Sequence, residues 1–368
     1  MTAAPYDLVV LGLSLSSSWG NGHATTFRAL LAGLERLGKR ILFLERDVPW
    51  YAENRDLPDP PFCRLAFYAS LEDLDRYRPE IAAAEMVLIG SYVPDGIAVI
   101  DKVLAAATGR VAFYDIDTPV TLAALDEEGA PFLDRRQIPA FDLYFSFTGG
   151  PTLDRLERAY GARRAVALYC SVEEARYRPT GEPYDWDLGY LGTYSPDRQP
   201  TLEALLIEPA RRLPDRRFVV AGPQYPDHID WPANVERIEH LAPADHASFY
   251  SRQRFTLNVT RADMIRAGWS PSVRLFEAAA CAVPIISDRW AGLGDVLPEG
   301  RAILPVDDGD AVVEHLTRMA EDQRRRVGAR GRAAVLASHT GLARAVEFIR
   351  ALASLDRETR RQSSADAA

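Results

Sequence analysis

The sequence is poor in cysteine and carries no excess of basic charge. Its 368 residues include only three cysteines, Cys63, Cys170 and Cys281, and no Cys-x-x-Cys pair. Such isolated thiols exclude a disulfide framework and a structural zinc site, and they are typical of a reduced, cytoplasmic protein. Acidic residues outnumber basic ones by 52 to 43, for a formal net charge of -9. This balance argues against a nucleic-acid-binding protein, which requires clustered lysine and arginine.

Long apolar runs are also missing. No run approaches the roughly 20 apolar residues that cross a bilayer, and residues 1–7 lack the basic and apolar regions of a signal peptide. The sequence therefore predicts a cytoplasmic protein without a transmembrane segment, and it leaves peripheral membrane contact and the oligomeric state open. With 47% hydrophobic and 26% charged residues, the composition is that of an ordinary globular protein. Its length suits about two domains.

Short apolar segments alternate with helical patterns along the whole chain. Because most of these segments are continuously apolar, they predict parallel strands covered on both faces, and their repetition predicts open, doubly wound α/β sheets. The expected strands are 7–12, 40–45, 86–90, 110–115, 141–147 and 163–169, then 186–191, 217–221, 235–240, 255–259, 283–287 and 302–306. The expected helices include 27–37, 201–212, 245–252, 271–281, 310–322 and 342–354.

A segment rich in proline and glycine divides this pattern at 173–185 and is expected to be a linker. We expect one Rossmann-like domain over 1–172 and a second over 186–338. A final helix is expected over 339–355, and the polar tail over 356–368 is expected to be disordered. Two such domains would face a cleft between the carboxyl ends of their strands. Ligands of open parallel sheets bind outside those ends, so we expect the functional residues there.

The most informative segment surrounds the expected helix 271–281. Ser270 and Pro271 are favourable at the N-cap and at the first helical position, so the helix would begin directly after a loop. Its free N–H groups would bind an anion such as a diphosphate, and Arg274 would add a charged fork. Glu277 lies on roughly the same side and could accept two hydrogen bonds from the vicinal hydroxyls of a ribose. The alternative is an i,i+3 ion pair between Arg274 and Glu277 on a helix surface.

The run Arg-Leu-Phe-Glu-Ala-Ala-Ala-Cys-Ala-Val-Pro, which starts at Arg274, resembles the donor-site helix of GT-B glycosyltransferases, whose usual form is Glu-Ala-x-Ala-x-Gly-x-Pro. With Ser272 it gives Ser-x-Arg-x-Phe-Glu, which is most similar to the group named after the spore-maturation protein CgeB, among family 1-type glycosyltransferases. The resemblance implies a GT-B fold, with an acceptor domain over 1–172 and a nucleotide-sugar donor domain over 186–338. It also implies that Glu277 binds the ribose of the donor, and that the final helix over 339–355 crosses back to pack on the first domain.

Two positions depart from the pattern of this family. Ala282 stands where a glycine is usual, and a glycine would matter if the backbone there were left-handed. Trp269 stands where many retaining GT-B enzymes carry a glutamate that contacts the donor sugar. The stereochemistry, the sugar, the nucleobase and the acceptor are therefore left open.

Three glycine-containing loops of the second half are further candidates for donor contacts. Gly192 would allow close approach of a pyrophosphate, which Arg198 could reach. Gly222 belongs to a loop that could lie near the nucleobase, and Gly292 to one that could offer backbone N–H groups. Each segment also fits an ordinary turn. The expected donor-binding residues are Gly192, Tyr194, Arg198, Gly222, Pro223, Ser270, Ser272, Arg274, Glu277, Gly292 and Leu293.

The loop after the first strand carries the candidate catalytic chemistry. It lacks the Gly-x-Gly-x-x-Gly spacing and a closing Lys-Ser/Thr, which disfavours a dinucleotide fingerprint and a P-loop. Its small residues Gly20, Asn21 and Gly22 favour an acceptor-side loop. His23 follows at a helix start, where the dipole would lower the pKa of an imidazole and suit it as a general base. Asp117, after the fourth strand, is a second candidate. The alternatives are a packing histidine and an N-cap aspartate.

The resemblance implies sugar transfer from a nucleoside-diphosphate sugar to an acceptor hydroxyl on a glycan, a lipid or a small molecule, as in polysaccharide biosynthesis. No metal or other cofactor is expected, since nothing near the Asp-x-Asp of 115–117 completes a metal site. One alternative is a non-catalytic GT-B module that binds a sugar nucleotide or glycan in polysaccharide assembly. Another is a nucleotide-sugar epimerase, which would need several acid–base residues around one sugar.

Overall fold

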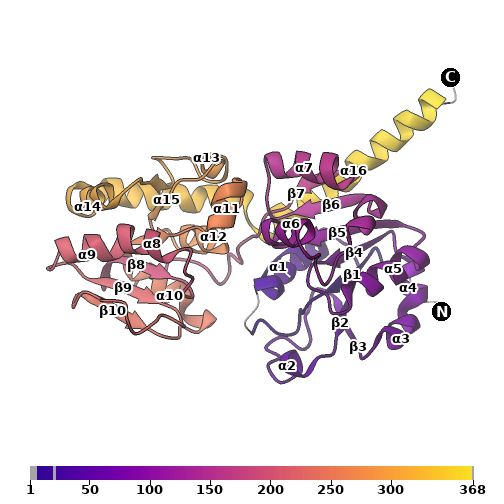
Figure 1. The fold of residues 1–368 in the computed structure, drawn as a ribbon, viewed down its shortest axis with the longest axis horizontal. Helices are drawn as coiled ribbons and strands as arrows, with labels where there is room; N and C mark the ends of the chain where they lie inside the picture. The colour runs from indigo at the N-terminus through magenta and orange to yellow at the C-terminus, as the bar shows by residue number, and fades with distance from the viewer. Residues whose placement is uncertain (1–5, 20–21, 367–368) are drawn as a thin grey trace. The chain divides into compact units, whose positions relative to one another are not determined.

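The computed structural model describes residues 6–19 and 22–366 (Figure 1). The chain divides into two compact units: unit 1 contains Met1–Ser171 and Gly341–Ala368, and unit 2 contains Val172–Thr340. Each unit is built on one parallel sheet with helices, so the predicted architecture of two doubly wound α/β sheets is confirmed. No helix in the described ranges is both long enough and apolar enough to cross a membrane.

The sheet of unit 1 has seven strands in the order β3-β2-β1-β4-β5-β6-β7. Its central strand β1 is buried on both faces: Val9 and Leu11 join one core cluster, whereas Leu8 and Val10 join the other. The strand order reverses between β1 and β4, which is where ligands of such sheets bind. The strands are β1 (Leu8–Gly12), β2 (Ile41–Arg46), β3 (Arg64–Tyr68), β4 (Met86–Gly90), β5 (Arg110–Asp115), β6 (Leu143–Ser146) and β7 (Ala165–Ala167).

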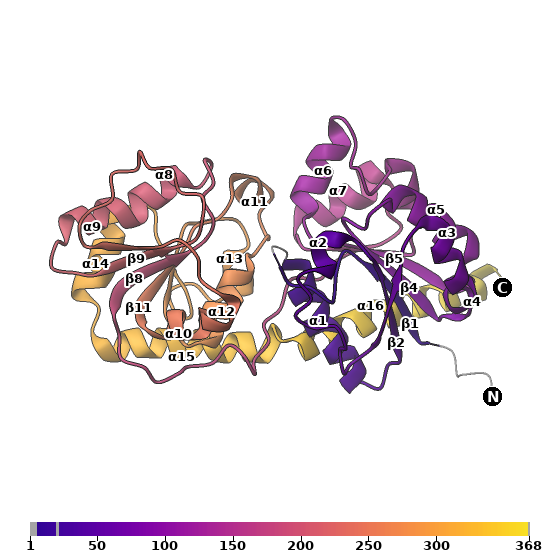
Figure 2. The ribbon, with the colours of Figure 1, turned by 90° about the horizontal axis from the view of Figure 1, so that it is seen from below.

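The helices of unit 1 cover both faces of this sheet (Figure 2). The long C-terminal helix α16 packs along α1, and its Phe348 shares a buried cluster with Leu30 and Leu34. The two helices approach closely, since a Cβ on Gly33 would lie 2.4 Å from the carbonyl oxygen of Gly341. The helices are α1 (Gly22–Arg36), α2 (Pro49–Ala52), α3 (Leu71–Leu74), η1 (Asp75–Tyr77), α4 (Arg78–Ala83), α5 (Gly96–Ala106), α6 (Thr118–Asp126), η2 (Arg135–Ala140), α7 (Pro151–Tyr160) and α16 (Gly341–Asp366).

The sheet of unit 2 has six parallel strands in the order β10-β9-β8-β11-β12-β13. The strands are β8 (Trp186–Leu191), β9 (Phe218–Ala221), β10 (Val235–Ile238), β11 (Gln253–Asn258), β12 (Ile285–Ser287) and β13 (Leu304–Pro305). The helices are α8 (Gln199–Leu202), η3 (Glu203–Ile207), α9 (Glu208–Arg212), η4 (Pro243–Asp245), α10 (His246–Ser251), α11 (Ala262–Ala267), α12 (Val273–Ala280), α13 (Leu293–Val296), α14 (Gly309–Arg318) and α15 (Glu321–Ser338).

Several helices differ from the sequence-based prediction. The expected helix 201–212 is divided by the π-helical segment η3, because Pro209 has no N–H for the carbonyl four residues before it. The expected helix 310–322 ends at Arg318, and α15 begins anew at Glu321. Helix α16 continues to Asp366, so the prediction of a disordered tail from 356 does not hold for its described part. The arginine, glutamate and alanine of that segment favour a helix.

Candidate functional site

The candidate site of unit 2 lies at the carboxyl edge of its sheet, where the loops after β8, β11 and β12 meet. Asn258, the last residue of β11, connects them. Its side-chain oxygen accepts hydrogen bonds from Ser272 Oγ at 2.9 Å and from Arg274 Nη1 at 3.2 Å. Its Nδ2 donates to Ser287 Oγ at 3.0 Å. Asn258 therefore fixes the beginning of α12 against the ends of two strands.

Helix α12 begins two residues later than predicted. Its N-cap residue is Ser272, with φ -76° and ψ 151°, and Val273 is its first helical residue. The prediction that Ser270 caps a helix starting at Pro271 is therefore wrong. The physical reason is the bond from the Ser272 hydroxyl to Asn258, which holds this residue in an extended conformation outside the helix. Both Ser270 and Pro271 are buried.

Two of the predicted donor residues, Arg274 and Arg198, contact the same loop after β8. Arg274 Nε donates to the Leu191 carbonyl at 2.5 Å, and its guanidinium lies 4.8 Å from the centre of the Tyr190 ring. Arg198 Nη2 donates to the Thr193 carbonyl at 2.7 Å, while its buried Nε has no hydrogen-bond partner. Two guanidinium groups therefore contact this loop, one from Arg274 on α12 and one from Arg198 at the start of α8.

Three arginines, Arg198, Arg261 and Arg274, lie near one another in this region. Burial lowers the pKa of Arg198, and the nearby positive charges of Arg274 and Arg261 lower it further. Over the part of the chain that the structure describes, none of these three arginines forms an ion pair with a carboxylate. Carboxylates act on these arginines only at longer range, Asp197 on Arg198 and Arg261 and Asp288 on Arg274. The three guanidinium groups can therefore attract an anion.

The predicted loop glycines bring backbones close together. A Cβ on Gly192 would lie 2.8 Å from Arg274 Nη2. Gly222 has φ +139°, and a Cβ there would lie 2.1 Å from the carbonyl oxygen of Gly192. The adjoining residues Tyr194 and Pro223 are joined by a 3.0 Å hydrogen bond from the Tyr194 N–H to the Pro223 carbonyl. The loops after β8 and β9 therefore form one surface in which glycine is required at position 222.

Glu277 is buried on α12, with 8% of its surface exposed. The Tyr250 hydroxyl donates to its Oε2 at 3.5 Å, and His246 Nδ1 lies 3.9 Å from the same oxygen. Burial raises the pKa of Glu277 to about 7, against the opposing effect of a hydrogen bond from the Tyr177 hydroxyl. No ion pair joins Glu277 to Arg274, both of which the structure describes, so the alternative of a surface i,i+3 ion pair does not hold.

The two departures from the family pattern both have left-handed backbones. Ala282 has φ +59°, a conformation that costs an alanine about 1–2 kcal/mol. Trp269 has φ +42°, and its Nε1 donates to the Asp295 carboxylate at 2.6 Å. Its ring covers Gly292, where a Cβ would lie 2.4 Å from the indole. The predicted residue Gly292, at the N-cap of α13, is thus packed under Trp269, and Leu293, the first residue of α13, is buried.

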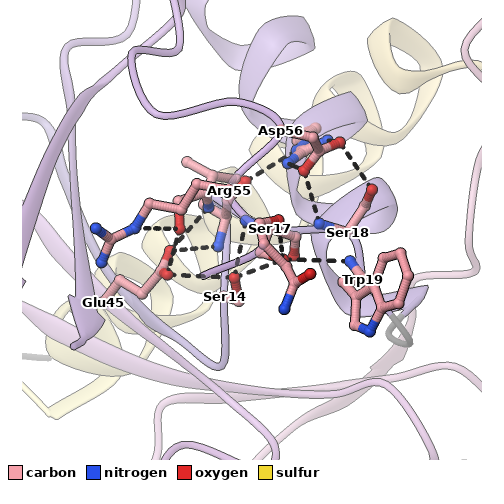
Figure 3. Close-up of polar contacts among 11 residues, drawn as sticks. Ser14, Ser17, Ser18, Trp19, Glu45, Arg55 and Asp56 are labelled. Atoms are coloured by element: carbon pink, nitrogen blue, oxygen red, sulfur yellow. Dashed lines mark hydrogen bonds and ion pairs between the residues drawn. The ribbon is translucent and has the colours of Figure 1, made fainter. Parts of the chain in front are cut away.

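In unit 1, two carboxylates hold the loop that follows β1, as Figure 3 shows. Glu45 is fully buried and accepts hydrogen bonds from the backbone N–H groups of Leu15 and Ser16, at 2.6 and 2.8 Å. Asp56 accepts from the N–H and the hydroxyl of Ser18, each at 2.8 Å, and from both terminal nitrogens of Arg28. Although burial raises the pKa of Asp56, these hydrogen bonds outweigh it and hold that pKa well below its usual range.

The predicted base His23 is the second residue of α1. Its ring meets that of Tyr92 edge-on with 5.3 Å between centroids, and its Nδ1 is buried without a hydrogen-bond partner. Burial lowers its pKa to about 4, so the ring is neutral at pH 7. The shift has the predicted direction, and burial is its cause. Gly22 is exposed at the helix start, whereas Gly20 and Asn21 lie outside the described residues.

The two aspartates after β5 have different surroundings. Asp115 is fully buried, accepts hydrogen bonds from the hydroxyls of Tyr144 at 2.7 Å and Thr121 at 2.8 Å, and has its pKa raised to about 6 by burial. Asp117 occupies the N-cap position of α6 but makes no side-chain cap hydrogen bond. Within residues 6–19 and 22–366, no group of three histidine, cysteine, aspartate or glutamate side chains could hold a metal ion.

Sequence reasoning missed Asn258, Glu45, Tyr177 and His246. Asn258 and Glu45 are polar residues near the carboxyl ends of buried strands, which is a signal that could have identified them. Tyr177 and His246 carry no such signal, because they reach Glu277 only through the folded arrangement of segments far apart in the sequence.

Comparisons with known proteins agree with this architecture. A family model described as "Glycosyl transferase-like" matches residues 198–350, so this part of the chain carries a glycosyltransferase-like domain. It includes both Arg198 and the whole of α12. No curated protein sequence matches the chain significantly.

Several solved structures resemble the whole chain. Sucrose-phosphate synthase from Thermosynechococcus elongatus has a TM-score of 0.65 at 15% identity, over 96% of this chain and 100% of that one. Anabaena HepE, solved in complex with UDP and glucose, has a TM-score of 0.67 at 10% identity, over 95% and 100%. A UDP-forming trehalose-phosphate synthase from Burkholderia vietnamiensis has a TM-score of 0.59 at 12% identity, over 94% and 99%. These likenesses show that the fold is GT-B.

Proposed function

We propose that this protein transfers a sugar from a nucleoside-diphosphate sugar to an acceptor hydroxyl, without a metal cofactor. The observation that carries the proposal is the group of arginines without carboxylate partners, Arg198, Arg261 and Arg274, around the loop after β8. A diphosphate would supply the missing negative charge, and two guanidinium groups are suited to its oxygens. These fixed cations would also stabilise the charge that develops on the departing diphosphate, in place of a metal ion.

Glu277 would bind the ribose of the donor. It lies on the same helix as Arg274, one turn further along, and its carboxyl is held by tyrosine hydroxyls. The complex of Anabaena HepE with UDP and glucose makes UDP the first nucleotide to test. A relationship to the CgeB-like group rests on the run from Ser272 to Glu277 and is part of this proposal.

His23 is the candidate general base for an inverting reaction. Its ring is neutral at pH 7, because its pKa is lowered to about 4, and can therefore accept a proton. Asp117 is the second candidate, since it lies two residues after the end of β5, at the carboxyl edge of the sheet. Loss of a general base typically lowers a rate 10²–10⁴-fold. A retaining enzyme would need neither residue as a base.

The test is a thermal-shift series with UDP, dTDP, GDP and ADP. A ligand at a hundred times its Kd adds about 2.7 kcal/mol of stability, and one nucleoside diphosphate should stabilise the wild type to that extent. We expect Arg198→Gln and Arg274→Gln to lose most of the shift. Arg266→Gln is the matched control, because Arg266 is exposed and pairs only with Asp263. The proposal fails if no nucleotide stabilises the wild type or if all three variants respond alike.

An activity assay on variants of His23 and Asp117 tests which of them is the general base. Release of nucleoside diphosphate from the corresponding nucleotide sugar should be slowed at least a hundredfold in His23→Ala, with the nucleotide-induced stabilisation unchanged. The same loss in Asp117→Asn, with His23→Ala active, would assign the base to Asp117 instead. Full activity of both variants would exclude a base at either position.

A further inference from the structure

Two tryptophans of unit 1 are more than half exposed, Trp19 at 52% and Trp50 at 61%. Trp19 lies in the loop after β1, and Trp50 lies in α2, directly after β2. Both therefore stand at the carboxyl edge of the sheet, the edge at which open parallel sheets bind ligands. Large indole rings are usually buried to a high degree, so two rings exposed at the ligand-binding edge of one sheet are candidates for contact with a ligand.

The segments that carry the two rings are bonded to each other. Ser17 Oγ donates to the Asn54 carbonyl at 2.7 Å, and the Leu57 N–H donates to the Ser16 carbonyl at 2.9 Å. Asn54 Nδ2 in turn donates to the Trp50 carbonyl at 2.9 Å. The loop after β1 and the segment after β2 are thus one hydrogen-bonded surface.

This surface is held in place before any ligand binds. Figure 3 shows Trp19 at the margin of the network that Glu45 and Asp56 form with the loop. The Trp19 N–H donates to Ser17 Oγ at 3.3 Å, and Arg28 Nε fixes the loop further by donating to the Leu15 carbonyl at 2.9 Å. A preorganised loop loses little conformational entropy on binding, and an indole has only two side-chain torsions to restrict.

The charge of the surface decides between possible occupants. Four acidic residues lie in or beside the segment after β2, at Asp47, Glu53, Asp56 and Asp59. The two arginines that contact the loop are neutralised, since Arg28 pairs with Asp56 and Arg55 pairs with Asp47. Because the four carboxylates outnumber the two arginines, the surface stays net negative and repels the anionic headgroups of a membrane. It suits a neutral ligand rich in hydroxyl groups, because carboxylates accept hydrogen bonds from hydroxyls.

We propose that Trp19 and Trp50 form a platform on which the sugar rings of a glycan acceptor stack. The apolar face of a pyranose would lie on the indoles, while its hydroxyls would reach the surrounding carboxylates. Trp19 is four residues before the candidate base His23 in the sequence. This inference rests on the proposed function and narrows its acceptor to a glycan, rather than a lipid or a small apolar molecule.

Isothermal titration with maltohexaose, cellohexaose, chitohexaose and xylohexaose tests the platform. We expect at least one of them to bind the wild type, and Trp19→Ala/Trp50→Ala to bind it at least tenfold more weakly. Trp19→Phe/Trp50→Phe should restore most of the affinity, since it keeps aromatic faces. Leu37→Ala, which removes another exposed apolar side chain of unit 1, should bind as the wild type does.

Three results would overturn the platform: no oligosaccharide binds the wild type, the double alanine variant binds equally well, or the tryptophans are needed for sedimentation with phosphatidylcholine–phosphatidylglycerol vesicles instead. The last result would assign the surface to a membrane. The nucleotide thermal-shift series distinguishes failure of the tryptophan platform from failure of the proposed sugar transfer. A normal UDP response without oligosaccharide binding refutes the platform alone, whereas tryptophan-dependent oligosaccharide binding without any nucleotide response refutes the transferase and leaves a glycan-binding surface.

Discussion

Burial of Glu277 should make the stability of the folded protein depend on pH in a measurable way. Its pKa is raised to about 7 in the folded protein, from an ordinary value of 4.5. The folded state therefore binds the proton more tightly than the unfolded state does. Between pH 4.5 and 7, the contribution of this group to stability falls as the pH rises, and above pH 7 the loss is complete. The full effect is on the order of 3 kcal/mol.

We expect Glu277→Gln to remove this dependence. Urea unfolding of unit 2 at pH 5, 6, 7 and 8 should show the wild type losing stability relative to the glutamine variant up to about pH 7 and no further. The comparison with the variant is needed because burial also raises the pKa of Asp288, which belongs to unit 2 as well and contributes a loss of stability of the same sign. A difference between the two proteins that does not change with pH would contradict the raised pKa.

Single residues of the site were predictable only where the local pattern showed them. Arg274 and Glu277 belong to one helical segment next to a buried strand, and the structure places both on α12. Their roles stay predictions. Asn258 was missed, because its contacts join β11, β12 and α12, which the sequence shows only as separate segments. The cause of the pKa shift of His23 was also missed, since burial depends on neighbours such as Tyr92.

At the scale of elements, the two loops after β8 and β9 depend on one glycine. We expect Gly222→Ala to destabilise unit 2 by more than the roughly 1–3 kcal/mol that a strained φ costs, because its Cβ would also collide with the Gly192 carbonyl at 2.1 Å. Gly300→Ala is the matched control: it has φ +67° but open space around its Cβ position. Thermal unfolding of both variants measures the difference, and equal losses would show that the loops do not depend on their close approach.

The elements themselves were largely predictable, because a strand buried on both faces leaves a continuous apolar run. β4, β5 and β8 coincide with their predicted ranges. The edge strand β3 was missed, since it begins with the exposed Arg64 and only Tyr68 is buried. Helix α15 was missed for a related reason: its first turns are rich in charged residues, and its buried positions include two glycines and Arg324 in place of an apolar stripe.

At the scale of the whole molecule, the chain leaves unit 1 after Ser171, builds unit 2 and returns with α16. Unit 1 is therefore completed by the last segment of the sequence. Phe348 of α16 is 2% exposed and stacks on Phe145 of β6, with 5.0 Å between the ring centroids. The helix is thus part of the core of unit 1 and not an appendage to it.

This arrangement predicts that Phe348→Ala lowers the stability of unit 1 and leaves nucleotide binding by unit 2 unchanged. Loss of a buried phenylalanine side chain typically costs 3–5 kcal/mol, and the loss should appear in the unfolding of unit 1. The nucleotide-induced stabilisation of unit 2 should be unchanged, because all of its candidate donor residues lie between Val172 and Thr340. Phe348→Leu, which leaves a smaller cavity, should give the same pattern with a smaller loss. If Phe348→Ala abolished the nucleotide response while unit 1 stayed folded, the donor site would depend on α16, and the independence of the two units would be refuted.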